Sequence, residues 1–138
     1  MTAFEPQDVR PLDQCMNELV GLVKGIRHAV LISRDARLIA ASSGLSGGDA
    51  ENLASAAHGM RTVADELGRL SRAGAVLHAM VETEHAFLSL AAVPYGRSLA
   101  VISDAGADIG RIGYEMTLLV KRVAAPYEIP GQRISRDE

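Results

Sequence analysis

The chain has 138 residues, of which 48% are hydrophobic and 22% are charged, and its formal net charge is −3. This composition predicts one folded domain and excludes a largely disordered chain. The mildly acidic balance argues against nucleic acid as a partner, and no apolar run is long enough to insert into a membrane. The only cysteine, Cys15, excludes an internal disulfide, which is typical of the reducing cytoplasm.

The first expected element is a helix that follows a flexible N-terminal tail, residues 1–10. It begins at Pro11, its apolar side chains recur at helical spacing, and Gly25 ends it. The stretch HAVLISRDARLIAAS then predicts two short strands joined by a charged turn. Because this turn lacks the glycine that a tight hairpin favours, we expect a longer loop or a β-bulge there.

A long central helix follows the glycine-rich stretch GLSGGDAE. Ser46 stands three residues before Asp49, which is the spacing of a capping box, and the helix should run to about Arg72 with Gly74 marking its end. Its apolar residues form two neighbouring strips that are together wider than the face packing on one core. The large strip is Leu53, Met60, Val63, Leu67 and Leu70, and the small strip is Ala50, Ala54, Ala57, Ala64 and Gly68.

Three strands are expected next, over residues 75–82, 86–93 and 98–103, and a last helix over 107–124. Their connections are too short for helical crossovers, so these strands should form an antiparallel meander. The resulting fold class is α/β, a five-stranded antiparallel sheet with the long central helix on one face and the two terminal helices on the other. The domain should span residues 11–125, and residues 126–138 should form a flexible C-terminal tail.

No pattern for catalysis, metal binding or cofactor binding is found. The histidines form no HExxH pair and one cysteine gives no CxxC, so we expect no metal and no catalytic residue. The stretch GLSGG opens a helix, where an anion can bind, but it lacks the lysine of a P-loop. We therefore expect no nucleotide or other cofactor. His78 shares its strand face with Val76 and Met80, which is typical of a histidine in or near the core.

The order of elements resembles that of the Roadblock/LC7 domains over about residues 12–124. The segments that carry the resemblance are GIRHAVLISRDARLIAAS, GGDAENLASAAHGM and DIGRIGYEMTLLVKRV. The chain is similar to Roadblock proteins of actinobacterial operons that also encode a sensor kinase and a small Ras-like GTPase, although Ala36 stands where relatives usually carry glycine. The resemblance implies a non-enzymatic homodimer that binds the small GTPase, with the kinase as a further candidate partner.

The small strip of the central helix predicts how two copies associate. A strip of alanine and glycine lets a second helix approach closely, so we expect two central helices to pair about a twofold axis. The resemblance implies that the strand 75–82 also pairs with its copy. The expected dimer interface is therefore Ala50, Ala54, Ala57, Ala64, Gly68, Val76, His78 and Met80. The alternative is that the alanines are merely helix-favouring surface residues.

The polar flank of the central helix is the expected GTPase-binding surface. It carries Arg61, Asp65 and Arg69, for which the alternative is a set of solvated charges. For the whole protein, the competing function is a small-molecule sensor domain of PAS-like or profilin-like architecture. The low aromatic content of the chain, 4%, disfavours that function, because ligand pockets are usually lined by aromatic side chains.

Overall fold

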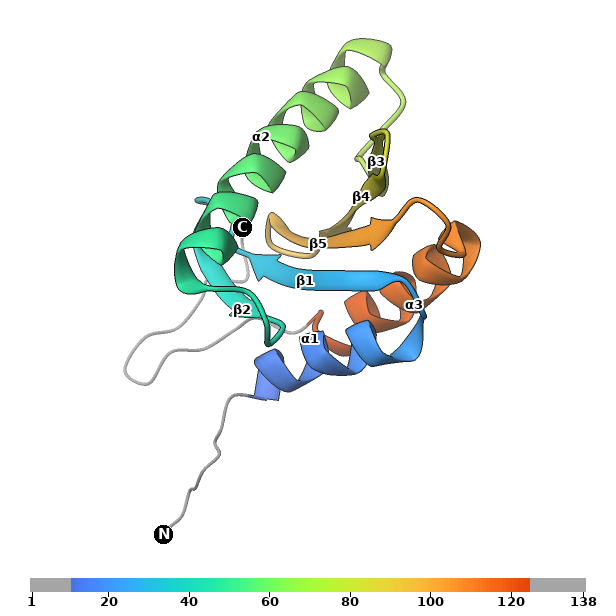
Figure 1. Ribbon diagram of the computed structural model, residues 1–138. Helices are drawn as coiled ribbons and strands as arrows, with labels where there is room; N and C mark the ends of the chain where they lie inside the picture. The colour runs from blue at the N-terminus through green and yellow to red at the C-terminus, as the bar shows by residue number, and fades with distance from the viewer. Residues whose placement is uncertain (1–10, 125–138) are drawn as a thin grey trace, which may run out of the picture.

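The computed structural model describes residues 11–124 as a three-layer α/β arrangement (Figure 1). The elements are α1 (Pro11–Leu22), β1 (Ile26–Ile32), β2 (Leu38–Ala41), α2 (Gly47–Ser71), β3 (His78–Glu82), β4 (Ala86–Val93), β5 (Arg97–Asp104) and α3 (Ile109–Arg122). The strands form one antiparallel sheet in the order β2-β1-β5-β4-β3. Helix α2 covers one face and helices α1 and α3 the other, so the predicted fold class is confirmed. The expected tails, 1–10 and 126–138, lie outside the described residues.

Both faces of the sheet are packed because inward and outward side chains alternate along each strand. On one face, residues such as Leu31 and Leu99 pack with Met16 of α1 and Met116 of α3. On the other face, Val30 and its neighbours pack beneath α2. None of the helices between residues 11 and 124 is long and apolar enough to cross a membrane.

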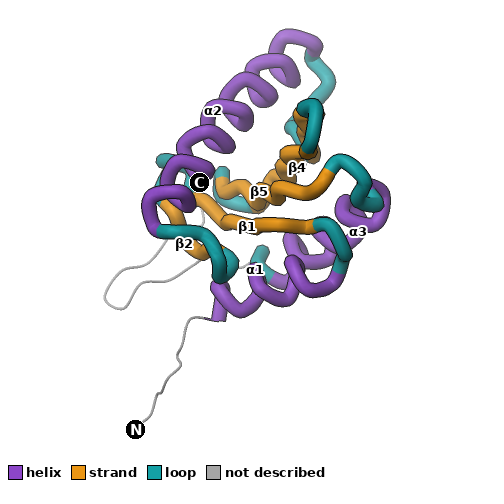
Figure 2. The backbone as a smooth tube through the Cα atoms, viewed as in Figure 1, coloured by secondary structure: helices purple, strands orange, loops and turns teal. Residues whose placement is uncertain are grey.

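Helix α2 begins as the capping pattern predicts and ends where it was expected, at about Arg72. The Ser46 hydroxyl accepts a hydrogen bond from the Asp49 amide at 3.0 Å. The helix stops at Ser71, and Arg72 adopts a left-handed conformation with φ of 55°. Figure 2 shows a loop descending from this end of α2 to β3. This loop takes up the first residues of the expected strand 75–82, so β3 begins only at His78.

The β1–β2 connection contains the irregularity that its lack of glycine predicts. The pairing register shifts between Leu31 and Ile32, and Ala36 takes a positive φ of 71°. The turn is closed by a hydrogen bond from the Ser33 amide to the Arg37 carbonyl at 2.8 Å. Alanine thus occupies a backbone conformation that glycine adopts at no steric cost.

The two edges of the sheet differ in how their backbone groups are satisfied. At the β2 edge, Asp13 of α1 accepts a hydrogen bond from the Ala41 amide at 3.0 Å. Just beyond it, Asn17 accepts one from the Ser43 amide at 2.7 Å. Helix α1 therefore caps the β2 edge. At the β3 edge, no further strand follows within residues 11–124.

Candidate protein-binding surfaces

The small strip of α2 packs on the sheet of its own protomer. Ala50, Ala54 and Ala57 are 2%, 1% and 0% exposed, respectively. Ala54 and Ala57 belong to the core cluster beneath the helix. Their short side chains let α2 lie close to the strands. Since these three alanines expose almost no surface, the prediction that they form a dimer interface is wrong.

The C-terminal end of the small strip is also used within the protomer. Ala64 and Gly68 are half-buried. A Cβ atom at Gly68 would lie 2.9 Å from the Gly74 carbonyl oxygen and 3.6 Å from Cγ2 of Val76. Gly68 therefore makes room for the loop that returns the chain to β3. Gly68 and Val76 therefore use part of their surface within the protomer, and their assignment to a contact between copies stays a prediction.

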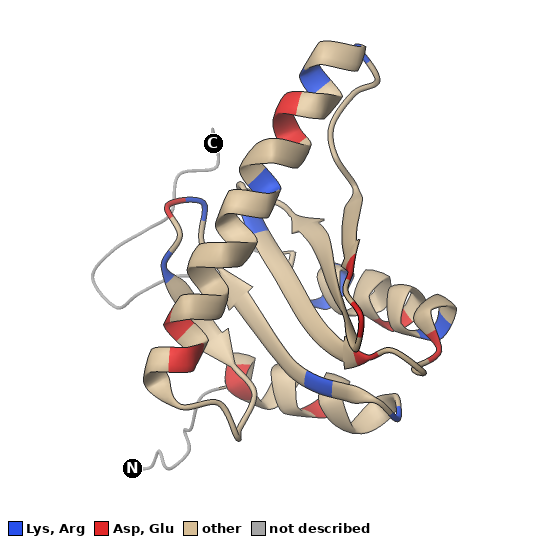
Figure 3. Ribbon diagram, turned by 45° about the horizontal axis from the view of Figure 1, so that its top comes forward, with Lys and Arg blue, Asp and Glu red and all other residues tan. Residues whose placement is uncertain are grey.

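The C-terminal part of the large strip remains uncovered, whereas Leu53 and Met60 pack partly against the core. Val63, Leu67 and Leu70 are 60%, 62% and 63% exposed, because the C-terminal half of α2 extends past the sheet (Figures 1 and 3). Leu77 and Val81 are also exposed. Residues two apart in a strand point to the same face, and Ala79 packs against the core beneath α2, so Leu77 and Val81 lie on the α2 side of the sheet. We call these residues the apolar surface: Val63, Leu67, Leu70, Leu77 and Val81. Large exposed apolar side chains on two elements joined by one loop are candidates for an interaction site.

Strand β3 presents unpaired backbone groups next to the apolar surface. The Leu77 carbonyl accepts from the Ala92 amide at 3.0 Å, and the Thr83 amide donates to the Ala86 carbonyl at 2.8 Å. Because the direction of backbone groups alternates along a strand, the amides and carbonyls of residues 78, 80 and 82 point away from β4. Among residues 11–124, no strand pairs with this outer edge.

Two of the predicted interface residues, His78 and Met80, lie on this open strand. Both side chains are exposed, so His78 is not the core histidine that the sequence suggested. They lie on the α3 side of the sheet, where they line a cavity of about 350 Å³ together with Tyr114 of α3. The open edge therefore has an exposed apolar patch on one side and an open groove on the other.

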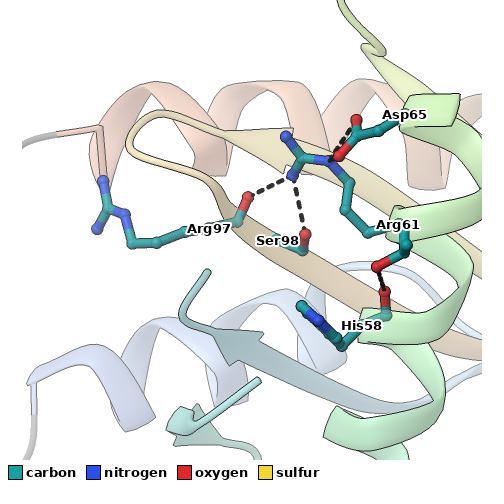
Figure 4. A network of polar contacts seen from close by, with 6 residues as sticks. His58, Arg61, Asp65, Arg97 and Ser98 are labelled. Carbon is teal, nitrogen blue, oxygen red and sulfur yellow. Dashed lines mark hydrogen bonds and ion pairs between the residues drawn. The ribbon is translucent and has the colours of Figure 1, made fainter. Parts of the chain in front are cut away.

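On the polar flank of α2, Arg61 is held mainly by its own protomer (Figure 4). Its Nη1 donates to the Arg97 carbonyl at 2.8 Å and to the Ser98 hydroxyl at 3.0 Å. Its Nε donates to the Asp65 carboxylate, with distances of 3.0 and 3.2 Å to the two oxygens. With its side chain 17% exposed, Arg61 fastens α2 to the start of β5. Asp65 and Arg69 are exposed, and Arg69 pairs with Glu66 on the same helix.

A polar cavity of about 360 Å³ lies beside this flank, between α2 and the turns β1–β2 and β4–β5. Its lining residues are Arg34, His58, Arg61, Thr62, Asp65, Tyr95 and Gly96. The two turns approach closely, because a Cβ atom at Gly96 would lie only 2.7 Å from the Cβ of Arg34. The sequence indicated the helix flank but not this cavity, since its walls come from three distant segments.

The β4–β5 turn is anchored by hydrogen bonds of Arg97, a residue that the sequence analysis did not identify. Its guanidinium is buried, and it donates to the Pro94 carbonyl at 2.9 Å and to the Ala124 carbonyl at 3.0 Å. It also lies 5.6 Å from the ring centre of Tyr95, within cation–π range. Burial lowers the pKa of Arg97 from its usual value, and Tyr95 opposes this shift. Arg97 thus joins the turn to the end of α3.

The Roadblock/LC7 domain family model matches residues 12–103. The chain belongs to the Roadblock/LC7 family. A Roadblock/LC7 domain from Streptomyces avermitilis is 33% identical over 80% of this chain and 92% of its own, with a TM-score of 0.77. A second Roadblock/LC7 domain structure from that organism is 34% identical over 81% of this chain and 97% of its own, with a TM-score of 0.67.

More distant solved structures share the fold alone. MglB from Myxococcus xanthus is 16% identical, covers 85% of this chain and 94% of its own, and has a TM-score of 0.76. A search among curated proteins found no match. The sequence resemblance to Roadblock proteins of actinobacteria is therefore confirmed, since Streptomyces relatives match both in sequence and in structure.

Proposed function

We propose that this Roadblock/LC7 protein is a non-enzymatic, homodimeric regulator of a small Ras-like GTPase in a bacterial signalling system of the cytoplasm. It would bind the GTPase and modulate its nucleotide cycle. The observation that carries the proposal is the open edge of β3 beside the apolar surface on α2. An unprotected edge next to exposed leucines is a feature that monomeric proteins avoid, because it invites association.

A second copy of the chain fits this open edge. The outward backbone groups of residues 78, 80 and 82 favour antiparallel pairing of two β3 strands about a twofold axis at Met80. In this register His78 lies opposite Glu82 of the second copy, which gives a complementary cross-strand pair. The second copy's α2 would then cover the apolar surface. One solved MglB, 16% identical to this chain, has a tetrameric arrangement, so a protein of this fold does self-associate.

The GTPase is the partner that the family resemblance implies. Ras-like GTPases change their switch loops between the GDP and GTP states, so a regulator has to contact atoms that differ between the two. A dimer would offer such loops one rigid composite surface built from two α2 helices. The sensor kinase encoded with similar proteins is a further candidate partner.

The proposal is tested by two measurements on the full chain. Sedimentation should report a dimer at tens of micromolar, and a monomer there would overturn the homodimer. A small Ras-like GTPase, loaded with GDP or a GTP analogue, should be captured better in one of the two states. Absence of binding in both states would overturn the regulatory function, and a co-purified small molecule would favour a sensor domain instead.

One variant locates the contact on α2. Arg69→Glu reverses an exposed charge without touching the bonds of Arg61. It should weaken GTPase capture and leave the dimer intact. Arg61→Glu is unsuitable for this purpose, because it would also break the hydrogen bonds that fasten α2 to β5. Equal capture by wild type and Arg69→Glu would place the interface elsewhere.

A further inference from the structure

We infer that the polar cavity between α2 and the two turns is a receptor for one carboxylate side chain, an aspartate or glutamate, of the protein partner. This inference rests on the proposed function, since the partner it addresses is the GTPase. Compared with the flank of α2 alone, the proposed contact surface also includes residues of the two turns. The inference further states that the partner's contacting group is negatively charged.

The charge around the cavity is positive although the whole chain has a net charge of −3. Among the described residues that line the cavity, two carry a guanidinium group, Arg34 and Arg61, and one carries a carboxylate, Asp65.

Arg61 is already held in place for such a contact. Its Nε and Nη1 are bonded to Asp65, to the Arg97 carbonyl and to the Ser98 hydroxyl. None of the hydrogen bonds found among residues 11–124 uses its second terminal nitrogen, Nη2. A guanidinium that is fixed before binding loses little further conformational entropy, and its free N–H groups suit a carboxylate acceptor.

His58 and Tyr95 provide polar groups on two other walls of the cavity. His58 lies one turn before Arg61, and its ring projects from the same side of α2 as the guanidinium (Figure 4). Tyr95 enters from the β4–β5 turn and has a positive φ of 69°. The opposite turn contains Ala36, also at positive φ. Two non-glycine residues in this conformation within the bordering turns are the kind of backbone strain that gathers at binding sites.

The occupant is a side chain of a protein and not a free anion. Asp65 already pairs with Arg61, and the cavity is open to solvent, so water weakens the attraction for any added carboxylate. A single exposed ion pair changes affinity by roughly fivefold or less. Such a contact selects and orients a partner only when the rest of an interface brings the carboxylate to it.

The test uses the GTPase of the proposed function and changes the charge of the cavity without removing Arg61. His58→Glu places a carboxylate at the cavity wall and should weaken GTPase binding by about fivefold, measured by calorimetry in the preferred nucleotide state. His58→Lys should bind at least as tightly as wild type. Ser55→Glu, an exposed position on the same helix, is the control for net charge. Thermal unfolding monitors the fold of each variant.

A second arm works without the GTPase. NMR spectra of the full chain titrated with sodium acetate, against sodium chloride at equal ionic strength, should show acetate-specific shifts of the Arg61 Nε–H and the Gly96 amide. These shifts should be lost in His58→Glu. Absence of acetate-specific shifts would overturn the inference, and so would equal GTPase affinities of His58→Glu and Ser55→Glu. Micromolar binding of acetate would also overturn it, by assigning the cavity to a free ligand. Failure of the wild type to bind any GTPase would contradict the proposed function instead.

Discussion

Replacing Leu67 by glutamine tests whether the exposed half of α2 is a contact between two copies. Glutamine has a similar length and a high helix propensity, so the helix itself should be preserved. Leu67 is 62% exposed in the protomer. Full burial of a leucine side chain contributes about 1.5–3 kcal/mol, and the exposed fraction therefore leaves about 1–2 kcal/mol to be gained on association.

The twofold axis doubles this effect, because each dimer contains the side chain twice. The variant should lose about 2–4 kcal/mol of dimerisation free energy, which corresponds to a roughly 30- to 700-fold higher dissociation constant. Sedimentation over a concentration series measures the constant. Circular dichroism should show an unchanged helix content in the dissociated variant.

Ser55→Gln is the matched control, because it places the same side chain on the exposed polar side of α2. Its dissociation constant should equal that of the wild type. If Leu67→Gln and Ser55→Gln dimerise equally well, the apolar surface is not the contact and the reasoning from exposure is refuted.

Three further predictions concern the core, the turn and the strand register. Ala57→Leu overfills the space between α2 and the sheet and should lower the free energy of unfolding by about 1–3 kcal/mol, measured with urea; an unchanged midpoint would contradict the close packing. Gly96→Ala forces a Cβ to 2.7 Å from that of Arg34 at a positive φ, so a loss of at least roughly 1–2 kcal/mol is expected in the same assay. In a variant without the native cysteine, Met80→Cys should form an intermolecular disulfide on oxidation, since twofold-related residues of a hydrogen-bonded pair lie about 5.5 Å apart. Val81→Cys should crosslink much more slowly, and the reverse order would exclude pairing centred on Met80.

The positions of helices and strands could be predicted because they depend on local periodicity. Strand β4 has the bounds 86–93 that its apolar run predicts, and Ser46 caps α2 as its spacing to Asp49 indicates. Strand β3 was expected three residues too early. Residues 75–77 instead belong to the loop that brings the chain back from the projecting end of α2. Nothing in the local sequence pattern predicts that a helix will project beyond the sheet.

Periodicity also separated the two strips of α2 correctly but did not reveal which one faces the sheet. Both strips are apolar, and the choice depends on how closely the helix can approach the strands. The short side chains of Ala54 and Ala57 allow the closer approach, so the large residues of the C-terminal half of α2 are left outside, while Leu53 and Met60 pack at the border of the core. Arg61 was expected to be a partner contact, but its guanidinium instead bonds the Arg97 carbonyl of the same protomer. The sequence could not predict this bond, because only the tertiary structure brings that carbonyl close to α2.

The capped edge of β2 bears on how large an assembly this chain can build. A sheet with two open edges can add copies without limit, and the product is a fibre. Here Asp13 and Asn17 already accept from backbone amides along one side, so strand addition is favoured on the other side. If two β3 strands pair as proposed, only the β2 edges, beside which α1 packs, would remain at the two ends of the sheet. Helix α1 would then disfavour further strand addition and favour a closed pair over polymerisation.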